Sequence, residues 1–219
     1  MTATDAPVPF DPYRLGRGRA DDPAVGHGAG GPATKRVIVA YGFWIFLLSD
    51  IVMFSAFFAS YAVLAGNTNG GPSGRTVFDL NNVAVETACL LISSFSCGMA
   101  SIAAGVRSKL AFYVMMLVTF AFGVAFISLE IREFVSLIQA GDGPSRSAFL
   151  SAFFALVGCH GAHVSAGLLW LLTMIAQVFA KGFRPEILRR ILCFSLFWHA
   201  LDIIWVAVFT VVYLLGVYP

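Results

Sequence analysis

Charged residues are scarce in this chain. Only 14 Lys and Arg and 12 Asp and Glu occur among 219 residues, which is 12% of the sequence, whereas 58% of the residues are hydrophobic. A soluble domain usually has about 25% charged residues. The first 36 residues contain five of the basic and four of the acidic residues, so very few remain for the other 183. Because these cannot cover the surface of a water-soluble protein, a soluble enzyme is excluded and an integral membrane protein is indicated.

Cysteine and net charge are also low. The four cysteines are Cys89, Cys97, Cys159 and Cys193; all lie in apolar stretches and none forms a CxxC pair. We therefore interpret them as small hydrophobic side chains and expect neither a disulfide framework nor a cysteine metal site. The net charge of +2 is too small to attract a polyanion, so no nucleic-acid partner is expected.

Long apolar runs make up most of the remaining sequence. Residues 1–36 are rich in Gly, Pro and Ala and are predicted to form a flexible cytoplasmic tail. Residues 37–219 are predicted to form an all-α domain of five transmembrane helices, because each apolar run exceeds the ~20 residues that cross a bilayer core. Continuous runs also favour helices over the alternating strands of a barrel. The predicted helices cover residues 37–65, 83–105, 110–133, 148–180 and 190–217.

Basic residues are concentrated in alternate loops. The loops at 106–109 and 181–190 contain two and four Lys or Arg, whereas the loops at 66–75 and 141–146 contain one each. The positive-inside rule then places the N-terminus in the cytoplasm and the C-terminus outside, in the periplasm. Tyr213, near the end of the last run, is interpreted as an anchor at the membrane interface.

Ionisable side chains within the predicted helices are few. Each costs several kcal/mol in a bilayer unless it is paired, hydrated or turned toward protein. Depth at about 1.5 Å per residue places Glu86 and Glu130 in the outer part of the membrane and the others near its centre. The candidate site residues are Asp50, Glu86, Glu130, His160, His163, His199 and Asp202.

Two pairs of these residues, His160 with His163 and His199 with Asp202, stand three apart and share a helix face. The residue types leave three interpretations open. Histidine is a common metal ligand, but no third ligand follows at a suitable spacing, so we expect no metal. A series of acids and histidines could instead carry protons. The third interpretation is interhelical hydrogen bonding, at about 0.6–2 kcal/mol for each bond.

Five sequence runs in this order resemble subunit III of the haem–copper terminal oxidases, and in particular its form in the cytochrome o-type ubiquinol oxidases. The runs are GFWIFLLSDIVMFSAFFASYAVL, VETACLLISS, FISLEIREF, SAFFALVGCHGAHVSAGLLW and FSLFWHALDIIWVAVFTVVYLLG. Asp50 and Glu130 match acids of the family, and the histidines and Asp202 match its GxHGxHV and WHxxDxxW runs. Five helices rather than seven also fit the quinol oxidase form.

The resemblance implies a subunit without a catalytic centre in a proton-pumping respiratory oxidase of the bacterial inner membrane. Quinol oxidation and the reduction of oxygen to water would belong to the complex, with the haems and copper in subunit I. This chain would contact subunit I directly, assemble with subunits II and IV, and bind phospholipid but no cofactor of its own. It would support assembly, stability and proton uptake.

Two alternatives remain open. One, within the same family, is subunit III of a cytochrome c oxidase. The other is a small membrane transporter that acts alone. Many transporters have an inverted repeat and helices that are interrupted by Pro near the substrate site. This sequence has no visible inverted repeat and no Pro in the core of any predicted helix, so the transporter is disfavoured.

Overall fold

The computed structural model describes residues 35–72, 74 and 78–217. The predicted tail of residues 1–36 lies outside this part, except for its last two residues. Within the described part, five helices are long and apolar enough to cross a membrane. The predicted all-α, five-helix fold is therefore confirmed.

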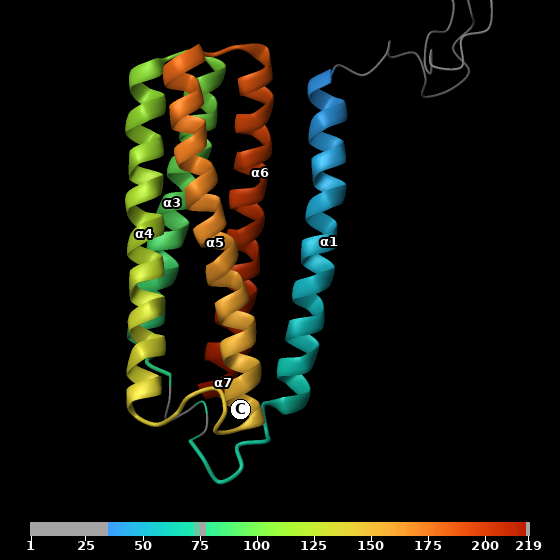
Figure 1. The fold of residues 1–219 in the computed structure, drawn as a ribbon, viewed down its shortest axis with the longest axis vertical. Coiled ribbons are helices and arrows are strands. Elements are labelled where there is room, and N and C mark those ends of the chain that lie inside the picture. Colours follow the sequence, from blue (N-terminus) through green and yellow to red (C-terminus); the bar gives the residue numbers. More distant parts are fainter. Residues whose placement is uncertain (1–34, 73, 75–77, 218–219) are drawn as a thin grey trace, which may run out of the picture.

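The helices run along one common direction (Figure 1). The last span begins as α6, continues through a six-residue π-helix, η1, and ends in one further turn, α7. The bounds are α1 Lys35–Leu64, α3 Leu80–Gly105, α4 Lys109–Gln139, α5 Ala148–Lys181, α6 Pro185–Val208, η1 Phe209–Leu214 and α7 Leu215–Val217.

Helix ends differ from the predicted ones where local chemistry overrides hydropathy. α3 begins at Leu80 because the Asp79 side chain caps it by accepting a hydrogen bond from the Asn81 amide at 3.0 Å. α6 begins at Pro185, five residues before the prediction, and proline suits the first turn of a helix. α4 continues to Gln139, six residues further than predicted, since the charged residues after Glu130 do not interrupt it.

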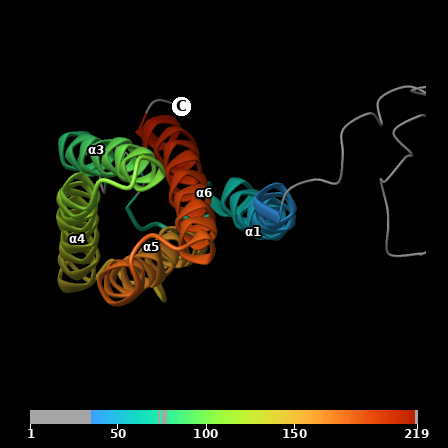
Figure 2. The ribbon, with the colours of Figure 1, turned by 90° about the horizontal axis from the view of Figure 1, so that it is seen from above.

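Helices α3 to α6 form a four-helix bundle, and α1 lies outside it against α5 and α6 (Figures 1 and 2). α1 contacts the bundle along one seam, with Leu47, Phe54 and Tyr61 buried at intervals of seven residues. Only 11% of the most apolar stretch of α1 is buried, against 28–44% in the other spans. Most of α1 therefore faces lipid or another protein.

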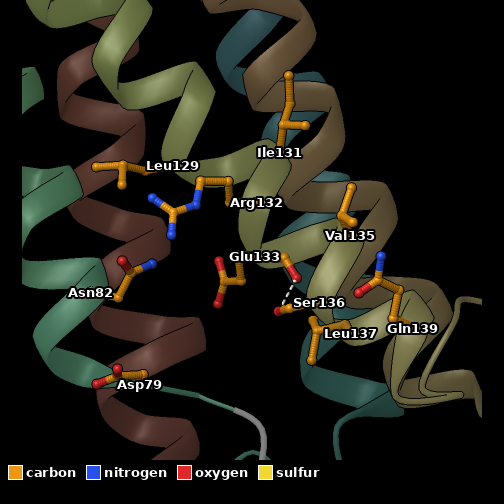
Figure 3. Close-up of a pocket in the computed structure, with 10 residues that line it drawn as sticks. All are labelled: Asp79, Asn82, Leu129, Ile131, Arg132, Glu133, Val135, Ser136, Leu137 and Gln139. Atoms are coloured by element: carbon orange, nitrogen blue, oxygen red, sulfur yellow. Dashed lines mark hydrogen bonds between the residues drawn. The ribbon is translucent and has the colours of Figure 1, made fainter.

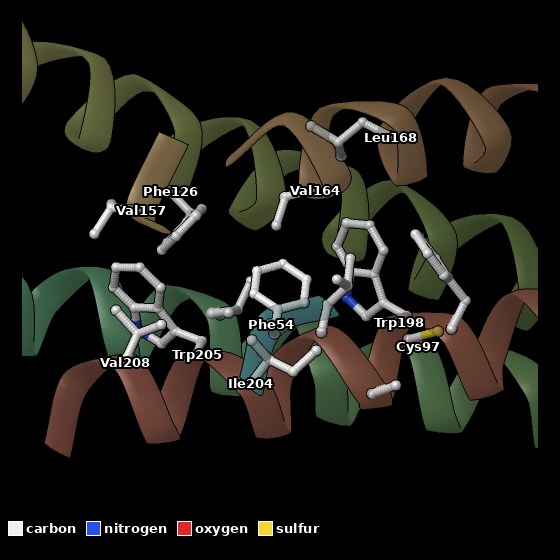
Figure 4. Close-up of a cluster of buried hydrophobic side chains, with 14 of the residues drawn as sticks. Phe54, Cys97, Phe126, Val157, Val164, Leu168, Trp198, Ile204, Trp205 and Val208 are labelled. Carbon is white, nitrogen blue, oxygen red and sulfur yellow. The ribbon is translucent and has the colours of Figure 1, made fainter. Parts of the chain in front are cut away.

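Aromatic side chains fill the centre of the bundle (Figure 4). Two buried tryptophans of α6 are held by hydrogen bonds to α3: Trp198 Nε1 donates to Ser93 Oγ at 3.2 Å and Trp205 Nε1 donates to Thr87 Oγ1 at 3.0 Å. A buried indole N–H needs such a partner. These bonds set the register between α3 and α6.

Candidate functional site

The seven candidate residues do not form one cluster in the structure. They lie at three different contacts between helices. The groups are Glu86 with Glu130, Asp50 with His160 and His163, and His199 with Asp202. Each group has its own surroundings and is described separately.

Glu86 of α3 and Glu130 of α4 belong to an acidic cluster where α3 begins and α4 ends. Their side chains are 0% and 4% exposed. Asn82 Nδ2 donates to Glu86 Oε1 at 3.0 Å, one helical turn away. The Oε2 atom of each glutamate is buried without a hydrogen-bond partner among the described residues.

Glu133 and Tyr213 complete this acidic cluster. Tyr213 OH donates to Glu133 Oε2 at 2.9 Å, which joins the end of the last span to α4. Tyr213 is completely buried, so its interpretation as an interfacial anchor was wrong. The π-helical segment that carries Tyr213 is apolar, FTVVYL, and has no sequence signal for the wider turn. Sequence reasoning therefore could not find this pairing, although π-helical turns are frequent at functional sites.

A cleft of about 490 Å³ leads to the acidic cluster between α3 and α4. In Figure 3 the side chains of Asn82, Arg132 and Glu133 point into the same space, with Asp79 at its edge. Glu133 thus connects the acidic cluster to an open cleft whose lining is partly polar and partly apolar.

His160 lies deeper in the bundle, inside an aromatic cage. Its ring centroid is 5.2 Å from that of Trp205, 5.8 Å from that of Phe126 and 6.3 Å from that of Phe54. Neither ring nitrogen has a hydrogen-bond partner among the described residues. His160 of α5 thus packs as an aromatic ring against one ring each from α1, α4 and α6.

Gly161 of α5, next to His160, packs directly against the Glu130 side chain of α4. A Cβ at this glycine would lie 2.7 Å from Glu130 Oε2. Only a residue without a side chain leaves room for the buried carboxylate. The GCHGAH run is therefore partly a packing motif for Glu130.

Asp50 and His163 lie at the contact between α1 and α5. His163 Nδ1 donates to the carbonyl oxygen of Cys159 at 2.8 Å, and the Phe54 ring meets the histidine ring edge-on at 5.3 Å. Asp50 is half-buried one turn before Phe54, close enough to Cys159 for an electrostatic interaction.

His199 and Asp202 occupy a third place, between α6 and α3. Ser94 Oγ of α3 lies 2.7 Å from His199 Nδ1. Both candidate residues are half-buried and line a groove that opens outward. The i, i+3 spacing placed them correctly on one face, whereas Ser94 was not predicted.

The geometry supports packing chemistry most directly. Tyr213 with Glu133 and Ser94 with His199 are hydrogen bonds between different helices, as the third interpretation requires. Among residues 35–72, 74 and 78–217, no group of three or more His, Cys, Asp and Glu side chains could hold a metal ion. The role of the seven residues in proton movement remains a prediction.

Comparison with known proteins gives a consistent result over nearly the whole chain. The family model described as cytochrome c oxidase subunit III matches residues 25–217. This range includes all five spans and all seven candidate residues.

Individual relatives carry more specific names. The chain is 50% identical over 202 residues to cytochrome bo(3) ubiquinol oxidase subunit 3 of Pseudomonas aeruginosa, covering 92% of this chain and 97% of that protein. It is 52% identical over 176 residues to the protein of the same name from Pseudomonas putida, covering 80% and 85%. It is 41% identical over 175 residues to quinol oxidase subunit 3 of Bacillus subtilis, covering 80% and 86%.

Proposed function

Since this chain belongs to the cytochrome c oxidase subunit III family, we propose that it is subunit III of a quinol-oxidising terminal oxidase of the cytochrome bo(3) type. The observation that carries the proposal is the identity of 50% with a ubiquinol oxidase subunit 3 over 92% of the chain. The quinol oxidase name also extends to the Bacillus subtilis relative. The chain is a multi-pass membrane protein, and we assign it to the bacterial inner membrane.

The proposed role is structural. Subunit I carries the haems and copper, oxidises quinol and reduces oxygen, and this chain contacts it within a complex that includes subunits II and IV. Two hydrogen bonds between helices support this role: Ser94 with His199 joins α3 to α6, and Tyr213 with Glu133 joins the end of the last span to α4. Apolar side chains on the outside of α1, such as Trp44 and Val52, leave a large surface for neighbouring subunits and lipid.

The electron donor distinguishes the proposal from the second candidate, subunit III of a cytochrome c oxidase, which the description of the family model favours. A tagged chain is purified from membranes in mild detergent, and its oxygen consumption is measured with a quinol and with reduced cytochrome c. We expect haem absorbance to co-purify and the quinol to be the effective donor. Activity with cytochrome c alone would support the second candidate. A purified chain without haem would contradict both and favour a transporter.

Phospholipid binding is the second part of the proposed role. A pocket of about 480 Å³ lies between α1, α5 and α6 at the end of the bundle where α6 begins. Val39, Phe43 and Trp170 provide an apolar wall, and two basic residues, Arg189 and Arg190, line the same pocket with one acid, Glu186. Basic side chains beside an apolar wall suit an anionic headgroup with its acyl chain.

Lipid retention tests this assignment. The double variant Arg189→Gln, Arg190→Gln should lower the anionic phospholipid that remains with the purified complex, as measured by mass spectrometry. Arg184→Gln, at the residue that precedes α6 and lies outside the pocket, is the matched control. Equal lipid in the double variant, the control and the wild type would exclude this pocket.

A further inference from the structure

A groove that opens outward is lined by residues of α3 and α6. α1 does not cover it, since that helix packs against α5 and α6 (Figure 2). The volume of the groove is about 340 Å³. Its apolar walls include Phe95, which is 72% exposed, and Met99, which is 40% exposed. It is lined by Leu91, Ser94, Phe95, Gly98, Met99, Ile102, His199 and Asp202.

The floor of this groove is polar. Ser94 Oγ contacts His199 Nδ1 at 2.7 Å, and both are the polar neighbours of Asp202. Asp202 Oδ1 is buried without a hydrogen-bond partner among the described residues. At Gly98 a Cβ would lie 3.8 Å from His199 Nε2, so the imidazole lies close across α3.

Depth makes this arrangement costly in lipid. Asp202 is 17 residues after Pro185 and 15 residues before Val217 in the last span. At about 1.5 Å per residue, it is more than 20 Å from either end of the span. Acyl chains surround a protein at this depth and cannot donate hydrogen bonds, so lipid cannot satisfy the Asp202 oxygen that lacks a partner, and polar groups there are costly unless they face protein.

We propose that the groove between α3 and α6 holds a transmembrane helix of another oxidase subunit, which presents a hydrogen-bond donor to His199 and Asp202. The apolar walls fit the side chains of such a helix, and the donor completes the polar floor. A second copy of this chain is a poorer occupant, because a two-fold contact would bring one carboxyl group toward the other. The inference rests on the proposed function, since it requires a complex with other subunits.

Photocrosslinking in the intact complex tests the proposal. Phe95 is replaced by p-benzoylphenylalanine, a mild change at an exposed aromatic position, and the complex is irradiated and analysed by mass spectrometry. The same replacement at Leu169 of α5, which is 67% exposed and outside the groove, is the control. We expect position 95, and not position 169, to form an adduct with one particular subunit. Adducts of position 95 only with lipid, or with a second copy, would overturn the proposal.

A second measurement addresses the donor. Asp202→Leu in the chain with the crosslinker at 95 should weaken association with that subunit about 3- to 20-fold, the range expected from one interhelical hydrogen bond. Asp202→Asn, which keeps an acceptor oxygen, should restore part of it. Unchanged adduct yield in Asp202→Leu would overturn the donor assignment. If haem and quinol oxidase activity co-purify but no subunit adduct forms, the docking site fails while the proposed function stands.

Discussion

Tyr213 joins the end of the last span to α4 through one partly buried hydrogen bond to Glu133. Its ring also packs against Phe78, with centroids 4.8 Å apart, and against Phe153 at 5.9 Å. A single residue thus connects the loop before α3, helix α5 and the acidic cluster. The hydroxyl provides the polar part of this connection and the ring the apolar part.

Tyr213→Phe separates these two contributions. The ring packing stays, but Glu133 loses its donor, and we expect a destabilisation of about 0.5–1.5 kcal/mol, the net contribution of a typical hydrogen bond. The measurement is the temperature at which this chain is released when the purified complex is heated. Tyr113→Phe, at a half-buried tyrosine of the same bundle, is the control. Equal stability of the two variants would show that the hydroxyl contributes nothing.

At the scale of elements, glycines determine how closely α4, α5 and α6 approach. The indole of Trp198 occupies space that two glycines leave free. A Cβ at Gly167 of α5 would lie 2.8 Å from Trp198 Cζ3, and one at Gly123 of α4 would lie 3.3 Å from Trp198 Cη2. Small residues allow such close packing in membrane bundles.

Gly167→Ala should therefore destabilise the bundle. The added methyl group would contact a rigid, buried indole, and overpacking of this kind costs about 1–3 kcal/mol. Gly158→Ala on the same helix is the matched control, because its Cβ would meet Phe134 Cε2 at an ordinary 3.6 Å. Heat unfolding of both variants in the purified complex measures the difference. A Gly167→Ala complex as stable as the control would contradict this account of the packing.

The seam of α1 gives a second prediction for an element. Phe54 is buried against His160 and His163, whereas Phe46 on the same helix is 54% exposed. Phe54→Ala should cost about 3 kcal/mol or more, the usual effect of removing a buried phenyl group. Phe46→Ala should have little effect on heat unfolding. If Phe46→Ala were the more harmful change, the outer face of α1 would be the one that packs in the complex.

At the scale of the whole molecule, charge separates the two ends of the bundle. The loops between α3 and α4 and between α5 and α6 lie at the same end as the start of α1 (Figure 1). Both connections are basic: Arg107 and Arg184 lie in the loops, and Lys109 and Lys181 are the helix-terminal residues beside them. This common placement supports the prediction that this end is cytoplasmic.

Reporter fusions test the orientation. Alkaline phosphatase, which is active only in the periplasm, is fused after Pro219 or inserted between Arg107 and Ser108. We expect activity from the C-terminal fusion and almost none from the insertion. The reverse pattern would place the basic loops outside and refute the assignment.

The five spans could be predicted from the sequence, because hydropathy and helix length are local properties, and the sequence also places the seven candidate residues within those spans. Residue spacing also placed His199 and Asp202 on one face. Helix ends were less accurate where a cap or a proline decided them, as at Asp79 and Pro185. The family resemblance likewise depended on the order of local runs.

Only the tertiary structure decided how these polar residues are grouped. Glu86 and Glu130 are joined by Glu133 and Tyr213, His160 is enclosed by aromatic rings, and His199 meets Ser94 at an open groove. Each contact joins residues far apart in the chain, and it depends on the rotation and register of whole helices. Those follow from side-chain packing between helices, such as Trp198 against Gly167, which hydropathy along one helix does not contain.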